Sequence, residues 1–158
     1  MLNRRRAILL KLATFALTGA LLAAPAFAQE VIGNAEAGAK VFAKCQTCHT
    51  VANEAGEVLA GKGAKTGPNL YGIAGRKAGS YPEFKYGASL VALGESGFVW
   101  DEASFVEYVN DPSKFLKAKL NDPKAKGNMS FKLPKEEDAQ NVWAYLVSLA
   151  PAAAPASN

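Results

Sequence analysis

Both cysteines of the chain and its one histidine lie in the segment CQTCHT at residues 45–50, as Cys45, Cys48 and His49. Two cysteines separated by two residues and followed directly by histidine form the attachment sequence of a c-type haem. On one turn of helix, both thiols can reach the two vinyl groups of one porphyrin and form thioethers. The histidine then lies beneath the ring, where a neutral imidazole nitrogen can bind iron. We predict one covalently attached haem c with His49 as an axial ligand.

Two other uses of these residues are open. A Cys-x-x-Cys pair can be a redox dithiol or a disulfide, but a thioredoxin-like dithiol belongs to a βαβ pattern that the chain does not show. A zinc site needs four ligands, and the sequence contains no further cysteine or histidine.

The second axial position decides the function of such a haem, and Met129 is the candidate for it. The other methionine is Met1, and Met129 lies in the lysine-rich segment KAKGNMSFKLP. A lone methionine often fills a core, but a polar loop is an unusual place for that role. A thioether ligand favours Fe(II) and leaves no site for a substrate, which indicates an electron carrier and not an enzyme. The alternative is a haem peroxidase or gas-binding protein with an open sixth position.

The first 28 residues have the pattern of an export signal. Arg4, Arg5 and Arg6 precede an apolar stretch, and AFA stands directly before Gln29. We predict cleavage after residue 28 and a periplasmic protein; a retained membrane anchor is the alternative, although the apolar run is short for a spanning helix. The predicted signal holds four of the 18 basic residues and no acidic one, which leaves 14 basic against 14 acidic side chains. This balance argues against nucleic-acid binding.

The remaining chain predicts an all-α domain over residues 29–150 with a flexible tail at 151–158. Asn34 is a candidate N-cap, Pro112 stops a helix, and Pro134 begins one. No segment alternates as a strand. Helices are expected in four segments, namely residues 34–45, 100–112, 113–120 and 134–150. Loops as long as those at 51–68, 69–84 and 121–134 are uncommon in a compact domain, and a large apolar group bound inside would explain how they stay ordered.

From about Glu30 to Leu149 the chain resembles the class I cytochromes c, and in particular the larger bacterial cytochrome c2 or c550 type. The segments that carry the resemblance are CQTCHT, KTGPNLYGIAGRKAG, YPEFKYG and NMSFKL. It implies the cytochrome c fold, with four to five helices and long loops wrapped around one haem.

The resemblance also implies roles for residues outside the haem motif. The Pro68 carbonyl would accept a hydrogen bond from His49, and Tyr108 would lie near the sulfur of Met129. Arg76, Tyr86 and Trp100 would surround the haem propionates. A plain turn at Pro68 and simple core packing of Trp100 and Tyr108 are the competing interpretations. Gly127 departs from the family, because many relatives have threonine there.

The two segments that follow each other before the last helix differ sharply in charge. Residues 86–113 contain five acids and no base, whereas residues 112–135 contain one acid, Asp122, and seven lysines, Lys114, Lys117, Lys119, Lys124, Lys126, Lys132 and Lys135. A lysine-rich haem edge, including Lys44, Lys117, Lys126 and Lys132, would steer a monomeric carrier to acidic docking sites. By resemblance, the partners are the cytochrome bc1 complex and a reaction centre, cytochrome oxidase or other periplasmic reductase. A merely solvated face is the alternative.

Overall fold

The computed structural model describes residues 31–150, and within this range the chain forms a helical domain with one small sheet. The predicted signal peptide at 1–28 and tail at 151–158 lie outside the described residues. The elements, in chain order, are α1 (Ala35–Phe42), β1 (Val51–Ala52), β2 (Val58–Ala60), α2 (Ala88–Glu95), α3 (Glu102–Asn110), α4 (Pro112–Leu120) and α5 (Glu136–Leu149). None of the helices in this part of the chain is long and apolar enough to cross a membrane.

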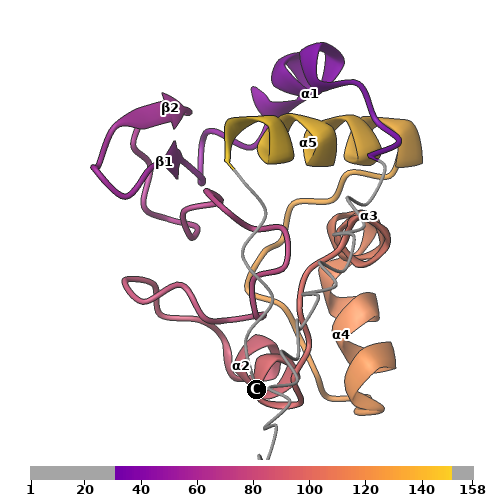
Figure 1. The fold of residues 1–158 in the computed structure, drawn as a ribbon. Helices are drawn as coiled ribbons and strands as arrows, with labels where there is room; N and C mark the ends of the chain where they lie inside the picture. The colour runs from indigo at the N-terminus through magenta and orange to yellow at the C-terminus, as the bar shows by residue number, and fades with distance from the viewer. Residues whose placement is uncertain (1–30, 151–158) are drawn as a thin grey trace, which may run out of the picture.

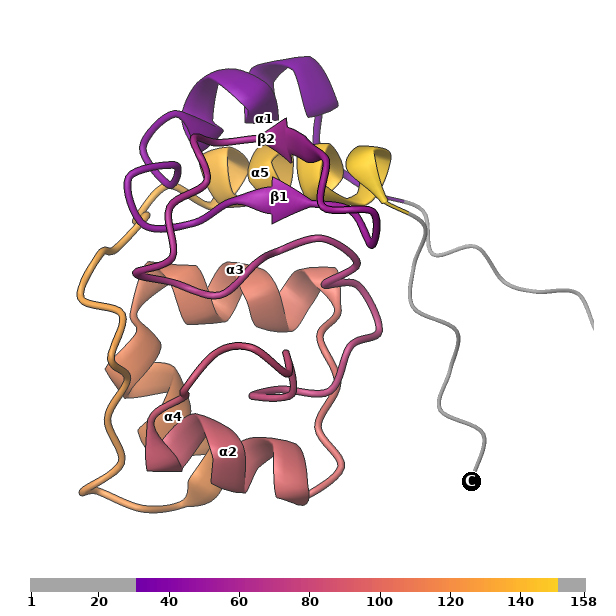
Figure 2. The same cartoon turned by 90° about the vertical axis from the view of Figure 1, so that its left-hand side faces the viewer.

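Helix α3 lies in the middle of the domain, between two groups of elements at opposite ends. Figure 2 shows α1, α5 and the sheet gathered at one end, α2 and α4 at the other, and α3 between them. The segment from α4 to α5, drawn in orange, runs along one edge of the molecule without regular structure, as its composition predicts. This long segment carries Met129, and its position along the edge lets it close one side of the interior.

The first and last helices cross in close contact (Figure 1). Asn34 caps α1 as predicted, because its side chain accepts a hydrogen bond from the Ala37 amide at 2.9 Å. A Cβ atom on Gly38 would collide with the carbonyl oxygen of Asn141 in α5, so only glycine permits this approach. The Phe42 and Tyr145 rings meet nearby, with centroids 5.6 Å apart. The contact anchors the start of the haem motif to the C-terminal helix.

Helices α3 and α4 follow each other almost without a loop. Asp101 and Ser104 form a capping box at the start of α3. Asp111 ends α3 and caps α4, where its side chain accepts from the Lys114 amide at 3.0 Å, and Pro112 takes the first position of α4. The predicted stop at Pro112 is therefore confirmed, and the turn between the two helices is held by a single residue.

Two predictions about secondary structure were wrong. The segment expected to be loop contains the antiparallel pair β1–β2, with Val51 opposite Ala60 and Ala52 opposite Val58. Helix α2 was not predicted at all. Its N-cap, Gly87, supplies no side-chain hydrogen bond, and no acid stands in its first turn, so the usual start signals are missing.

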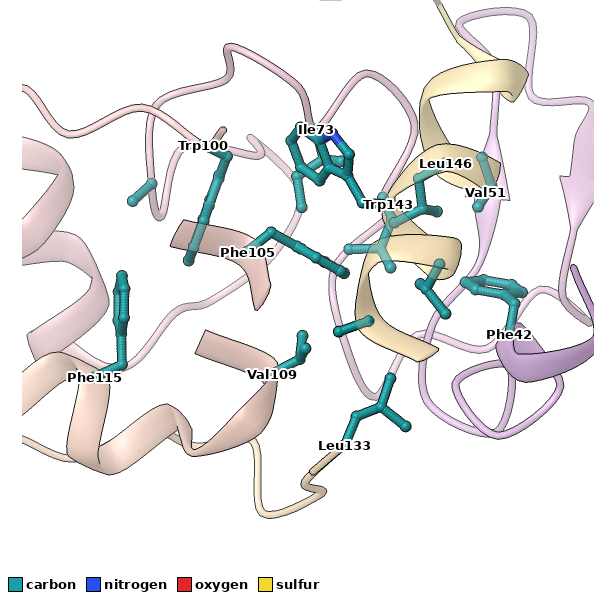
Figure 3. Close-up of a cluster of buried hydrophobic side chains, with 14 of the residues drawn as sticks. Phe42, Val51, Ile73, Trp100, Phe105, Val109, Phe115, Leu133, Trp143 and Leu146 are labelled. Carbon is teal, nitrogen blue, oxygen red and sulfur yellow. The ribbon is translucent and has the colours of Figure 1, made fainter. Parts of the chain in front are cut away.

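One apolar core spans both ends of the domain (Figure 3). Phe42, Val51 and Leu146 lie at one side of the view, and Trp100 and Phe115 lie at the other. Phe105 of α3 and Trp143 of α5 connect the two groups, with ring centroids 5.3 Å apart. Burial of these large side chains is the main stabilising term that the described residues supply.

Candidate functional site

The haem motif forms one helical turn after the end of α1. The Cys48 amide bonds to the Cys45 carbonyl at 3.1 Å, and the His49 amide bonds to the same carbonyl at 2.9 Å. Cys45 is half-buried, Cys48 is exposed, and both thiols are free. Burial raises the pKa of the Cys45 thiol to about 11, although the positive charge of Lys44 acts to lower it. A redox dithiol needs a stabilised thiolate, so this environment argues against thiol exchange.

The ring of His49 is fixed in one orientation. Its Nδ1 atom lies 2.9 Å from the carbonyl oxygen of Pro68. Because a carbonyl only accepts, Nδ1 must carry the proton and donate, which leaves the lone pair on Nε2 free to bind a metal. Burial lowers the pKa of His49, while the hydrogen bond to Pro68 opposes that effect, so the neutral imidazole is favoured. Gly67 packs directly against the ring, and a Cβ atom there would collide with it.

All predicted site residues line one cavity of about 500 Å³. Its wall includes Cys45, Cys48, His49, Pro68, Arg76, Tyr86, Trp100, Tyr108 and Met129. Apolar side chains such as Leu70, Ile73 and Phe105 make up much of the rest. This combination fits a flat apolar macrocycle that would take the two thiols at its vinyl groups, the imidazole and the thioether at its central metal, and cationic or hydroxyl donors at its carboxylates.

A larger hollow of about 990 Å³ lies between residues 31–32, α3, α4 and the start of α5. It shares no lining residue with the first cavity and contains no cysteine, histidine or methionine. Size alone would select this hollow, but both cysteines, His49 and Met129 line the smaller cavity. Among residues 31–150 no group of three His, Cys, Asp or Glu side chains could hold a metal ion, so the zinc alternative lacks ligands.

Arg76 is held by main-chain carbonyls beside the cavity. Its guanidinium donates to the Tyr71 carbonyl at 2.9 Å and to the Asn69 carbonyl at 3.0 Å. The ring of Tyr81 lies 5.5 Å from its central carbon. Burial lowers the pKa of Arg76, although the group remains a cation at neutral pH. The N–H groups not used on carbonyls can bind a carboxylate.

Asn69 was missed by the sequence analysis. Its side chain accepts from the Ala52 amide at 3.0 Å and donates to the Ala52 carbonyl at 2.7 Å, so it pairs with β1 as a strand would. Its own carbonyl holds Arg76. Asn69 thus links the sheet to the Arg76 loop. The only signal in the sequence was its place directly after Gly67 and Pro68.

Trp100 and Tyr108 form another part of the wall, and Phe115 lies behind them. The rings of Trp100 and Tyr108 meet edge to face at 5.1 Å, and Phe115 packs against both, at 6.0 and 5.6 Å. Burial raises the pKa of Tyr108 to about 12, with a smaller effect from Tyr86. Burial also raises the pKa of Tyr86, against the opposing charge of Arg76. Both phenols therefore stay neutral and can donate hydrogen bonds.

The far end of the Met129 segment is tied to the α3–α4 junction. Lys132 and Asp111 form an ion pair with Nζ 2.6 Å from Oδ2, and the Leu133 amide donates to the Val109 carbonyl at 2.7 Å. Met129 itself is half-buried against the core. The residues from Lys126 to Phe131 all line the cavity. The sequence indicated Met129, and the structure adds Phe131, which is 40 % exposed at the cavity wall.

Comparisons with known proteins give a consistent result. The chain is 60 % identical over 124 residues to cytochrome c2 of Fuscovulum blasticum, which covers 78 % of each protein. It is 44 % identical over 145 residues to cytochrome c-550 of Paracoccus versutus, which covers 90 % of this chain and 91 % of the relative. The crystal structure of cytochrome c2 from Rhodobacter sphaeroides superposes with a TM-score of 0.73 at 55 % identity, over 75 % of this chain and 97 % of that one. No protein-family model matches the chain.

Proposed function

We propose that the cavity holds haem c between His49 and Met129, because the chain belongs to the family of cytochromes c2 and c-550. Proteins of this family are electron carriers and not enzymes. Members of the family carry one covalently attached haem c. The family resemblance and the cytochrome c fold predicted from the sequence are thus confirmed. When bound, the group supplies one-electron chemistry between Fe(III) and Fe(II).

Cys45 and Cys48 would hold the group through two thioether bonds. Addition of a thiol to a vinyl group would place the sulfur on one carbon and the proton on the other, so the attachment would need no oxidant. His49 would bind the iron through the Nε2 lone pair, while its Nδ1–H is donated to the Pro68 carbonyl, which fixes the ring and would strengthen its donation. The observation that carries this assignment is the single cavity that contains both cysteines, His49 and Met129.

Arg76, Tyr86 and Trp100 bind the carboxylates of the group, and Tyr108 lies beside the Met129 sulfur. Two observations support these roles. All four residues line the same cavity, and the raised pKa values of Tyr86 and Tyr108 keep both phenols neutral, so that they can donate hydrogen bonds. A buried carboxylate needs charged or hydrogen-bonding donors, and the guanidinium of Arg76, fixed by two carbonyls, is such a donor.

The lysine-rich edge is the docking surface for redox partners. Lys44 and Lys126 line the cavity, so their charges lie beside the bound group. Lys117 is exposed on α4. Asp111 forms an ion pair with Lys132 and partly cancels its charge, so Lys132 contributes less than the other lysines to the attraction of an acidic partner. The proposed donor is the cytochrome bc1 complex, and the proposed acceptor is a reaction centre, a terminal oxidase or another periplasmic reductase. Small redox interfaces below about 1,200 Å² release their partners quickly.

The place of action follows from the predicted export signal. After cleavage at residue 28, the domain of residues 29–150 carries electrons as a monomer in the periplasm, the compartment in which bacterial c-type haem is attached.

The replacement Met129→Ala tests the ligand assignment. In the ferric wild type, a sulfur-to-iron charge-transfer band is expected in the near infrared, and the ferrous protein binds carbon monoxide slowly. In the variant the band disappears and carbon monoxide binds rapidly. A wild type that binds carbon monoxide rapidly without denaturant would instead favour the peroxidase or gas-binding alternative.

A further inference from the structure

The segment that carries Met129 has almost no main-chain hydrogen bonds of its own. Among the residues that the structure describes, only two amides from Lys126 to Lys132 donate a hydrogen bond. The Lys126 amide donates to the Ser89 hydroxyl at 3.1 Å, and the Gly127 amide donates to the Ser113 hydroxyl at 3.2 Å. Two serines therefore hold consecutive amides just before the proposed ligand.

The two serines come from different helices but occupy the same kind of position. Ser89 is the second residue of α2, and Ser113 is the second residue of α4. These two helices pack against each other at the end of the domain opposite α5. The hydroxyls thus belong to a rigid pair of helices, whereas the amides belong to an irregular segment.

Close packing limits where this segment can lie. A Cβ atom on Gly127 would stand 3.1 Å from the Cβ of Pro112, the residue before Ser113. A Cβ atom on Gly87 would stand 2.9 Å from the side-chain oxygen of Asn128. The segment therefore rests against the first residues of both helices, and the serine hydroxyls meet its amides at that contact.

We propose that Ser89 and Ser113 are positioning residues that keep the Met129 sulfur on the iron. The inference deepens the proposed function and rests on Met129 being a ligand. Iron–thioether bonds are weak, so the time that the sulfur spends off the metal depends on how easily its segment moves. With both amides held, the segment presents Met129 in one place, and the iron stays closed to other ligands. Loss of either hydroxyl frees an amide and lets the segment open.

The test uses the haem-loaded protein with Ser89→Ala, Ser113→Ala and the double replacement. Ser96→Ala is the matched control, because Ser96 donates its hydroxyl to the Leu93 carbonyl at the other end of α2. Two rates are measured: binding of imidazole to the ferric iron, which requires the sulfur to leave, and hydrogen exchange of the Lys126 and Gly127 amides by NMR. We expect each single replacement to raise both rates by about 3- to 10-fold, and the double replacement to raise them further. Ser113→Thr, which keeps the hydroxyl, should stay near the wild-type rates.

Two outcomes would overturn the inference. Imidazole rates in the double variant that match Ser96→Ala would show that the serines do not position the sulfur, even if amide exchange is faster. Amide exchange that also stays unchanged would show that the hydroxyls do not hold the segment. A wild type without the sulfur-to-iron band is a different failure, because it removes the proposed ligation itself.

Discussion

Gly67 lies directly against the imidazole of His49, and a Cβ atom at that position would collide with the ring. The same ring donates from Nδ1 to the Pro68 carbonyl at 2.9 Å. One short segment thus sets both the position and the tautomer of the imidazole, through a missing side chain and a main-chain oxygen.

Gly67→Ala should displace the imidazole and weaken its hydrogen bond. We expect the midpoint potential of the haem protein to rise, because the bond strengthens imidazole donation to Fe(III). We also expect a loss of about 1–3 kcal/mol in the free energy of unfolding from the overpacked site. Spectroelectrochemistry and denaturant titration measure the two effects. Pro68→Ala is the control: it keeps the carbonyl, so its potential should move less. Equal shifts in both variants would contradict this account.

Reversal of Lys117, Lys126 and Lys132 to glutamate should slow electron transfer with the bc1 complex by at least tenfold at low ionic strength, while the midpoint potential barely moves. The cause is the loss of electrostatic steering, which salt screens. Stopped-flow kinetics at several salt concentrations measures the effect. Two single variants serve as a matched pair, because Lys126→Glu and Lys40→Glu change the net charge equally. Lys126 lines the cavity, whereas Lys40 is exposed on α1. Equal rates for these two would exclude a localised docking surface.

The ion pair between Lys132 and Asp111 predicts a pH dependence of stability. The hydrogen bond from Lys132 lowers the pKa of Asp111, with a further contribution from the Lys114 amide. A carboxylate with a lowered pKa stabilises the fold above its ordinary value of 3.8 and loses that effect as the pH falls through the folded-state pKa. Asp111→Asn should therefore lower the melting temperature more at pH 7 than at pH 3, and the helix start is kept because asparagine still caps α4.

A double-mutant cycle checks the cause of that pH dependence. In a Lys132→Gln background, Asp111→Asn should have a smaller effect at pH 7 than in the wild type, because the main partner is already gone. Thermal unfolding followed by circular dichroism measures all four proteins. An effect of Asp111→Asn that is the same in both backgrounds, or the same at pH 7 and pH 3, would refute the ion-pair explanation.

Gly38→Ala should destabilise the contact between α1 and α5. The new methyl group would meet the Asn141 carbonyl, and we expect a loss of about 2–3 kcal/mol in the free energy of unfolding. Denaturant titration of the haem-loaded protein measures it. Ala39→Ser changes the next, exposed residue of the same helix and should cost less than about 0.5 kcal/mol. Similar costs for the two variants would mean that the helices do not need glycine at this crossing.

Local spacing alone predicted the residues for haem attachment and most of the helices of this protein. Cys45, Cys48 and His49 fall on one turn because they are three and four positions apart, so no distant contact is needed to bring them together. Asn34, Asp101 and Pro112 act on the helices that directly follow them. These signals can be recognised in the sequence because cause and effect lie within four residues.

Tertiary structure decided what these local signals could not. Helix α2 lacks start signals of its own and packs on α4, while its Gly94 lies where a Cβ atom would collide with the Ala78 carbonyl. The two short strands pair with each other, and Asn69 completes the hydrogen bonding of β1 from 17 residues away. The serine contacts to Lys126 and Gly127 join residues 37 and 14 positions apart. A serine hydroxyl can accept a hydrogen bond from any amide in the chain, so only the folded structure decides which amide becomes its partner.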